Sequence, residues 1–129
     1  MNKQMTILVV DDDEAFRESI ANALLTCGVT TFEMAASTKE AVAKISKTFF
    51  DIILVGLSMP HMMGLHFARE FRKLIPETKI VLMIEDQQLL ALDSAAQAKL
   101  NFPTILKSFV SRTLPQLLSE ESSALVLAI

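Results

Sequence analysis

Chemically reactive residues stand at the ends of short apolar runs in this chain. One run ends in Asp11 and Asp12, a later one ends in Lys107, and a run between them ends in Gly56. Two adjacent carboxylates make a hard oxygen site that suits Mg²⁺, which keeps several waters and takes one or two protein carboxylates. A lysine ammonium nearby can contact a phosphoryl oxygen or, without one, pair with the carboxylates. These residues form a candidate pocket in which Gly56 supplies no side chain.

The acidic residues also have a purely structural interpretation, in which they end a strand and cap the helix that follows. Asp13 stands where a helix N-cap is expected, and the positive end of a helix dipole favours acidic residues. An isolated pair of aspartates is compatible with either interpretation. The choice therefore depends on the rest of the pattern.

Short apolar runs alternate along the chain with segments of helical period. The runs predict strands over residues 5–10, 29–34, 52–55, 79–84 and 101–106. The segments between them predict four helices: one capped by Asp13 and ended by Gly28, one capped by Ser37 or Thr38, and two over residues 65–75 and 87–98. In the second helix Ala41, Val42 and Ile45 are expected to face inward, and a last helix should begin between Ser111 and Leu114, because Pro115 is acceptable only in a first turn.

Strands separated by helices require a parallel sheet with right-handed crossovers and helices on both faces. In such α/β doubly wound folds, sites form beyond the carboxyl ends of the strands. Asp11, Asp12, Gly56 and Lys107 all fall at such ends. The topology thus predicts that the candidate pocket is assembled at one edge of the sheet.

Composition limits the function classes that the chain can serve. Of its 129 residues, 51% are hydrophobic and 21% charged, which supports one core, and the net charge of -3 with scattered Lys and Arg argues against direct nucleic-acid binding. The single Cys27 excludes an internal disulfide, and no run is long enough to span a membrane, so we expect a cytoplasmic protein. We expect one domain over residues 1–120, followed at 121–129 by an apolar tail or the start of a linker.

At this point the chain resembles the receiver domain of two-component response regulators, over nearly everything from about residue 6 to 118. Residues 51–64, D-I-I-L-V-G-L-S-M-P-H-M-M-G, follow the family pattern D-x-x-L-x-D-x-x-M-P-x-M-x-G at every framework position except the phospho-acceptor aspartate, which is Gly56. The family's acidic pair matches Asp11 and Asp12, and its lysine matches Lys107. The resemblance implies a flavodoxin-like (βα)5 fold with strand order 2-1-3-4-5 and a role in phosphorelay signal transduction.

The departures from the family pattern fall where the family does its chemistry. Ile84 stands at the position of the switch hydroxyl, Glu85 at that of a small residue, Thr104 at that of the switch aromatic and Ser108 at that of a proline. In the family mechanism a phosphorylated aspartate and Mg²⁺ draw the hydroxyl inward, and the aromatic ring turns into the vacated space. The resemblance therefore implies a pseudo-receiver: a protein-interaction module, not an enzyme, that works without standard aspartyl phosphorylation.

Two other function classes stay open at this stage. One is a conventional Mg²⁺-dependent switch that accepts a phosphoryl group on another residue, such as Ser58, although no partner base is evident for it. The other is an unrelated enzyme on the same fold, which the acidic, glycine-free turn after the first strand disfavours, because phosphates enter through glycine-rich turns.

The pseudo-receiver hypothesis carries specific expectations for the pocket. No cofactor is required, Asp11 and Asp12 retain at most weak Mg²⁺ binding, and Lys107 pairs with one of them. Gly56→Asp alone should regain some metal binding without restoring the switch. Glu85 either adds a negative charge beside the acidic pair or turns to solvent and caps the helix at 87–98.

Expected partners are a histidine kinase, an effector domain or another receiver. A homodimer could form through the helix at 87–98, the strand at 101–106 and the last helix, since these segments hold many leucines: Leu89, Leu90, Leu92, Leu117 and Leu118. The competing expectation is that all of them face the core and the chain is monomeric.

Overall fold

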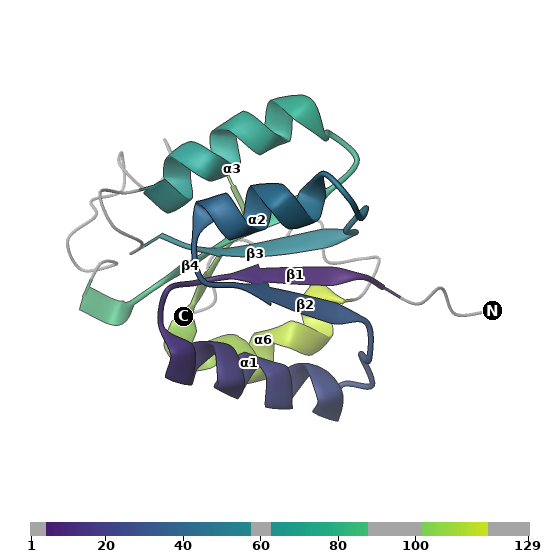
Figure 1. Cartoon of the computed structure of the whole chain (residues 1–129). Helices are drawn as coiled ribbons and strands as arrows, with labels where there is room; N and C mark the ends of the chain where they lie inside the picture. The colour runs from purple at the N-terminus through teal and green to yellow at the C-terminus, as the bar shows by residue number, and fades with distance from the viewer. Residues whose placement is uncertain (1–4, 58–62, 88–101, 119–129) are drawn as a thin grey trace.

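Five parallel strands form one sheet between two layers of helices in the computed structural model, which describes residues 5–57, 63–87 and 102–118 (Figure 1). The strand order is β2-β1-β3-β4-β5, which confirms the doubly wound α/β, flavodoxin-like prediction. The strands are β1 (Ile7–Val10), β2 (Phe32–Ala35), β3 (Ile52–Gly56), β4 (Lys79–Ile84) and β5 (Thr104–Leu106). The helices are α1 (Glu14–Thr26), α2 (Thr38–Ile45), α3 (Met63–Leu74) and α6 (Val110–Leu117), the last preceded by the 3-10 turn η2 (Lys107–Phe109).

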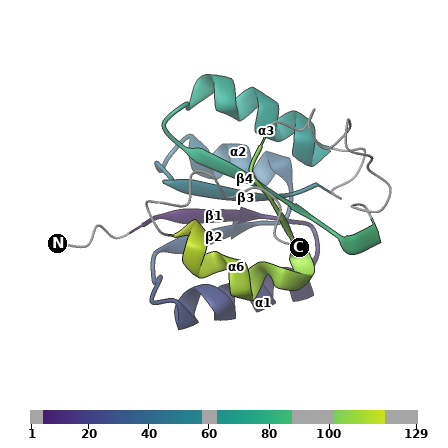
Figure 2. The same cartoon turned by 180° about the vertical axis from the view of Figure 1, so that it is seen from behind.

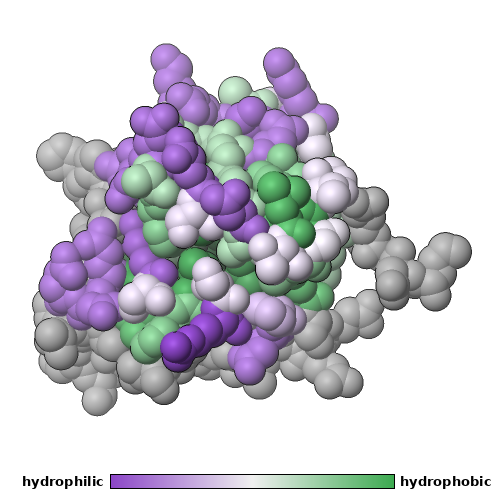
Figure 3. Space-filling model, turned by 90° about the horizontal axis from the view of Figure 1, so that it is seen from below, coloured by the Kyte–Doolittle hydropathy of each residue, from purple (hydrophilic) through white to green (hydrophobic). Residues whose placement is uncertain are grey.

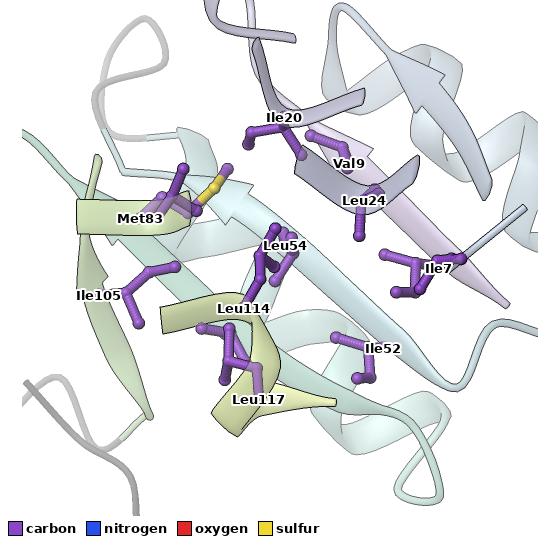
Figure 4. Close-up of a cluster of buried hydrophobic side chains, with 13 residues drawn as sticks. Ile7, Val9, Ile20, Leu24, Ile52, Leu54, Met83, Ile105, Leu114 and Leu117 are labelled. Carbon is purple, nitrogen blue, oxygen red and sulfur yellow. The ribbon is translucent and has the colours of Figure 1, made fainter. Parts of the chain in front are cut away.

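The strands are apolar on both faces because helices cover both faces. Ile7 and Val9 of β1 pack in the cluster shared with α1 and α6, whereas Leu8 and Val10 pack in the cluster shared with α2 and α3. Figure 2 shows the same layers from behind, and Figure 4 shows the α1 and α6 cluster closing around Leu54. Each fully buried side chain of this size contributes about 1.5–3 kcal/mol, an upper estimate.

Local signals place the helix ends where the sequence predicts them. Asp13 accepts a hydrogen bond from the Phe16 N–H at 3.2 Å and so caps α1. Ser37 accepts one from the Glu40 N–H at 3.1 Å and caps α2. Gly28, directly after the C-cap of α1, has a φ of 87°, the left-handed conformation that glycine adopts without strain.

Three expectations for individual elements are wrong. Val42 is 46% exposed, because α2 directs Ala41 to the core and leaves its neighbour at the surface. The second and fifth strands are shorter than the apolar runs: β2 covers residues 32–35 and β5 covers residues 104–106, and just before each of them the Thr31 and Pro103 carbonyl oxygens accept one hydrogen bond from a neighbouring strand. Helix α6 begins at Val110, so Pro115 lies inside it.

Helix α6 tolerates this proline because the lost bond faces water. Pro115 has no N–H for the Ser111 carbonyl, and both residues are exposed, so solvent can satisfy that oxygen. Most of the helix expected at 87–98 lies outside the described residues, as do Ser58, Asn101 and the tail at 121–129. None of the helices in the described part of the chain has the length and apolarity needed to cross a bilayer.

Gly64 lets the start of α3 approach the end of β3. A Cβ built on Gly64 would overlap the Gly56 carbonyl oxygen and would lie 3.0 Å from the Gly56 carbonyl carbon. Both atoms are backbone, so neither can move without shifting a strand or a helix. Gly64 is therefore required by close packing beside the candidate pocket.

We predict that Gly64→Ala lowers the free energy of unfolding by about 1–3 kcal/mol through overpacking. Urea unfolding followed by circular dichroism measures this, because the chain has no Trp or Tyr to report by fluorescence. Arg69→Ala, at an exposed position of the same helix, is the matched control and should stay within about 0.5 kcal/mol of the parent chain. Equal stabilities of the two variants would contradict the packing argument.

Candidate functional site

The carboxyl ends of four neighbouring strands meet at one edge of the sheet. Asp11 follows β1, Gly56 ends β3, Glu85 follows β4 and Lys107 follows β5. In a parallel sheet these ends face the same way, so residues distant in sequence come together there. We call the group formed by these residues the strand-end pocket.

A buried ion pair crosses the strand-end pocket. The Lys107 Nζ lies 2.7 Å from the Asp11 Oδ2, with side-chain exposures of 10% and 0%. This confirms the prediction that Lys107 pairs with a member of the acidic pair. The contact joins two opposite charges in a site with little access to water.

The Asp11 carboxylate fills the space that a side chain at position 56 would need. A Cβ built on Gly56 would overlap the Asp11 Oδ2 and would lie 3.0 Å from the Asp11 Cγ. Gly56 is itself part of a fully buried strand. The absent side chain has thus left a volume that the neighbouring carboxylate now occupies.

The backbone around Asp11 holds its carboxylate in this orientation. The Asp13 N–H donates to the Asp11 Oδ1 at 2.9 Å, and the Arg17 Nη1 donates to the Asp11 carbonyl oxygen at 2.7 Å. The Asp11 N–H donates to the Ala35 carbonyl oxygen at 3.0 Å, which extends the pairing of β1 with β2. With one carboxylate oxygen fixed by backbone, the other is directed at Lys107.

Glu85 stands at the rim of the pocket and faces Lys107. Its Oε2 lies 3.7 Å from the Lys107 Nζ, and its Oε1 accepts a hydrogen bond from the Gln87 Nε2 at 2.7 Å. The side chain is 37% exposed, so it is neither fully buried nor turned wholly to solvent. Of the two expectations for Glu85, the structure therefore favours the added negative charge beside the acidic pair.

The positions at which the family resemblance places the switch are packed or hydrogen-bonded within the domain. Ile84 is 1% exposed and packs in an apolar cluster with Leu57 and Leu106. The buried Thr104 hydroxyl donates to the Phe102 carbonyl oxygen at 3.0 Å. At the position of the expected proline, the Ser108 hydroxyl donates to the Asp86 Oδ1 at 2.9 Å, a bond that ties η2 to the segment after β4.

The acidic residues do not combine into a site that fits Mg²⁺. Asp12 is exposed, Asp11 already faces an ammonium, and Gly56 adds no carboxylate. The described residues contain no group of three or more His, Cys, Asp or Glu side chains that could hold a metal ion. A hard divalent ion takes several oxygen ligands, and Asp11 is the one buried carboxylate of the pocket among the described residues.

Two residues of the pocket do not follow from the family pattern. The Lys107 Nζ lies 4.6 Å from the centroid of the Phe16 ring, a cation–π contact, and Arg17 holds the Asp11 carbonyl. Both lie in the first turns of α1, directly after the acidic pair. Their closeness in sequence to the strand end is the signal that could have indicated them.

An open groove lies away from the strand-end pocket, between α1 and α6. It has a volume of about 770 Å³ and is lined by Ser19, Asn22, Ala23, Thr26, Cys27, Ser111, Pro115 and Leu118. Figure 3 views this side of the molecule and shows apolar surface among more hydrophilic side chains. The groove contains no charged residue, so it adds nothing to the chemistry of the pocket.

Comparison with known sequences finds one family. The model of the response regulator receiver domain matches residues 7–119. The chain is 30% identical to the chemotaxis protein CheY-3 of Vibrio cholerae over 125 residues, which cover 93% of each protein. It is 31% identical to the response regulator MprA of Mycobacterium ulcerans over 82% of this chain but only 47% of MprA, so it spans about half of that relative.

Solved structures give the same result. A CheY-like receiver domain protein of Methanospirillum hungatei superposes with a TM-score of 0.75 at 28% identity, covering 93% of this chain and 94% of that one. The chemotaxis protein CheY4 of Vibrio cholerae superposes with a TM-score of 0.71 at 25% identity, covering 90% and 97%. Both similarities extend over almost the whole of the compared chains.

We predict that Gly56→Ala lowers the free energy of unfolding by about 1–3 kcal/mol, because the new methyl group pushes the Asp11 carboxylate off Lys107. In an Asp11→Ala background the same change meets no carboxylate and should cost less. Urea unfolding of both single variants and the double variant measures the coupling, expected at about 0.5–3 kcal/mol. Strictly additive effects would show that the two positions do not share this volume.

Proposed function

The chain belongs to the response regulator receiver domain family, and on that premise we propose that it is a pseudo-receiver, a protein-interaction module of two-component signalling that works without aspartyl phosphorylation. Receiver domains act between histidine kinases and effectors. In this one the acceptor position is a glycine. The single observation that carries the proposal is that the Asp11 carboxylate, paired with Lys107, fills the volume of the missing acceptor side chain.

The residues around the pocket support the same conclusion. A phosphoryl group on position 56 has no side chain to bond to, and the lysine that would face it already has a carboxylate at 2.7 Å. Ile84 lacks the hydroxyl that would report phosphorylation, and Thr104 lacks the ring that would move in response. The module therefore presents one conformation, which a protein partner reads or alters.

Asp11 is a poor replacement acceptor, although it is a carboxylate beside a lysine. It is fully buried, and its two oxygens face the Asp13 N–H and the Lys107 ammonium. A phosphodonor could reach it only after the pair opens. This geometry disfavours the alternative of a conventional switch that uses another residue of the pocket.

The proposal places the domain in the cytoplasm and assigns it protein partners: a histidine kinase, an effector domain or another receiver. The free, exposed Cys27 supports a reducing compartment. Because MprA is about twice as long as the matched segment, the output of this chain is not inferred from that relative.

We expect no stable phosphoryl adduct after incubation with acetyl phosphate and Mg²⁺, because the acceptor carboxylate is absent. Intact-mass spectrometry under mild conditions measures this, with a receiver that carries aspartate at the matching position as the positive control. A persistent addition of one phosphoryl group to this chain, while the control behaves normally, would overturn the proposal in favour of another acceptor.

The homodimer expected from the leucine content now depends on fewer residues. Leu117 is 1% exposed in the core and adds nothing to an apolar surface, whereas Leu118 packs partly against that cluster and otherwise lines the open groove between α1 and α6. Leu89, Leu90 and Leu92 lie outside the described residues. The proposed homodimer therefore rests on those three leucines.

We predict that the chain dimerises in EDTA without any phosphodonor, because no switch controls the surface. Light scattering across micromolar concentrations measures the mass, and Leu90→Glu should produce a monomer. Leu74→Glu is the matched control, since Leu74 is 71% exposed on α3 and should leave the dimer intact. A monomer at every concentration of the parent chain would eliminate the homodimer.

A further inference from the structure

The open groove between α1 and α6 is formed by one face of each helix. Its lining residues follow helical spacing from Ser19 to Cys27 on α1, and on α6 they are Ser111, Pro115 and Leu118. Both helices follow strands of one parallel sheet, so they run in the same direction and their C-terminal ends lie at the same end of the groove. Cys27 and Leu118 therefore mark that end, whereas Ser19 and Ser111 mark the other.

The groove suits an uncharged, apolar occupant. It has a volume of about 770 Å³ and no charged side chain lines it. The hydroxyl of Thr26, one of its polar groups, already donates to the Asn22 carbonyl oxygen at 2.9 Å within α1. A charged peptide would lose hydration in this groove without gaining an ionic partner, whereas an apolar peptide would gain from the surface that it buries.

The chain supplies such a segment soon after the groove. Leu118 lines the groove, and it is followed by the polar residues 119–123, S-E-E-S-S, and then by the apolar segment 124–129, A-L-V-L-A-I. A polar connection of this length is sufficient for a chain to reverse direction, since loops of about 2–5 residues join antiparallel helices. The apolar segment reaches about 20 Å when extended, which exceeds the roughly 10 Å of helix between Ser111 and Leu118.

The outer edge of β5 competes with the groove for this segment. β5 stands at one edge of the sheet in the described part of the chain, and a strand beside it would follow β5 through α6. The step from β3 to β4 advances across the sheet in the same direction, but its helix α3 lies on the opposite face from α6 (Figure 1). Such crossovers are right-handed in about 98% of cases, so the same step through α6 would be left-handed. The topology thus disfavours a sixth strand at this edge.

We propose that the apolar segment 124–129 folds back into the groove between α1 and α6 of its own chain and covers it. Residues 119–123 form the turn, the segment runs antiparallel to α6, and its first residues lie beside Cys27. The face formed by α1 and α6 is then closed to a partner until the segment leaves. This proposal does not depend on the pseudo-receiver hypothesis, because neither the groove nor the segment includes a residue of the strand-end pocket.

Cys27 reports on the docked segment, because it is the only cysteine of the chain and lines the groove. The test measures the rate of its alkylation by iodoacetamide in the full chain and in the double variant Leu125→Glu/Leu127→Glu, whose charges find no partner in the groove. A segment docked about nine-tenths of the time leaves about one-tenth of the molecules reactive, so alkylation should be about tenfold faster in the double variant. Equal rates in the two chains would overturn the proposal.

Ser122→Glu is the matched control for charge. It adds a negative charge between Leu118 and the apolar segment but leaves the segment itself unchanged. Its Cys27 should react at the rate of the parent chain. Acceleration in this control as large as in the double variant would show an effect of charge alone and contradict docking of the apolar segment.

Two further reporters show whether the segment covers the whole groove. In a Cys27→Ser background, Ser111→Cys places the thiol at the far end of the groove, and Lys39→Cys places it at an exposed position of α2, on the opposite face of the sheet. The two glutamate substitutions should accelerate alkylation of the Ser111→Cys chain and leave that of the Lys39→Cys chain unchanged. Equal acceleration of both, or none at the groove, would overturn the proposal.

Protein concentration separates docking within one chain from exchange between two chains. With iodoacetamide in excess, the rate constant for Cys27 is measured over a range of micromolar protein concentrations. Protection that is the same throughout this range supports docking within the chain. Protection that increases with protein concentration would assign the groove to the segment of a second copy and overturn the proposal.

Discussion

The buried ion pair between Lys107 and Asp11 is the constraint on which the strand-end pocket depends. Removing one partner of a buried pair leaves the other charged group without compensation, which costs about 3–5 kcal/mol in other proteins. The pair also spans the sheet, since it links the end of β1 with the end of β5 over the intervening strands. The place of Glu85, the contact with Phe16 and the need for glycine at position 56 all follow from this one contact.

The ion pair stands beside the positions to which the family resemblance assigns the switch. In a switch, a site and a surface are coupled because both bias an element that has two arrangements. Here Ile84 is packed among leucines and the Thr104 hydroxyl donates to the Phe102 carbonyl oxygen just before β5, so neither position supplies the group that the family resemblance places there. If the domain is the pseudo-receiver proposed above, a partner that recognises it meets a surface set by packing.

Much of the fold could be predicted because its causes are local. Continuous apolar runs mark strands covered on both faces, and Asp13, Ser37 and Gly28 mark helix ends through bonds and dihedral angles confined to a few residues. The exposure of Val42 and the position of Pro115 in α6 could not be predicted, because they depend on how each helix is rotated against the sheet. The charged members of the pocket were likewise evident as strand ends. The position of the Asp11 carboxylate in the space beside Gly56 was not, since it depends on packing in three dimensions.

The space beside Gly56 that the Asp11 carboxylate occupies has a consequence for restoring the acceptor. Replacing Gly56 by aspartate looks like a simple way to supply an acceptor carboxylate. An aspartate at position 56, however, would overlap the Asp11 carboxylate and would face a lysine that is already paired with it. Ile84 and Thr104 would lack the hydroxyl and the aromatic ring on which the restored group would act. Restoring any one of these groups alone is unfavourable or has no effect until the others are restored. A change at position 56 alone would therefore leave the rest of the pocket fitted to glycine.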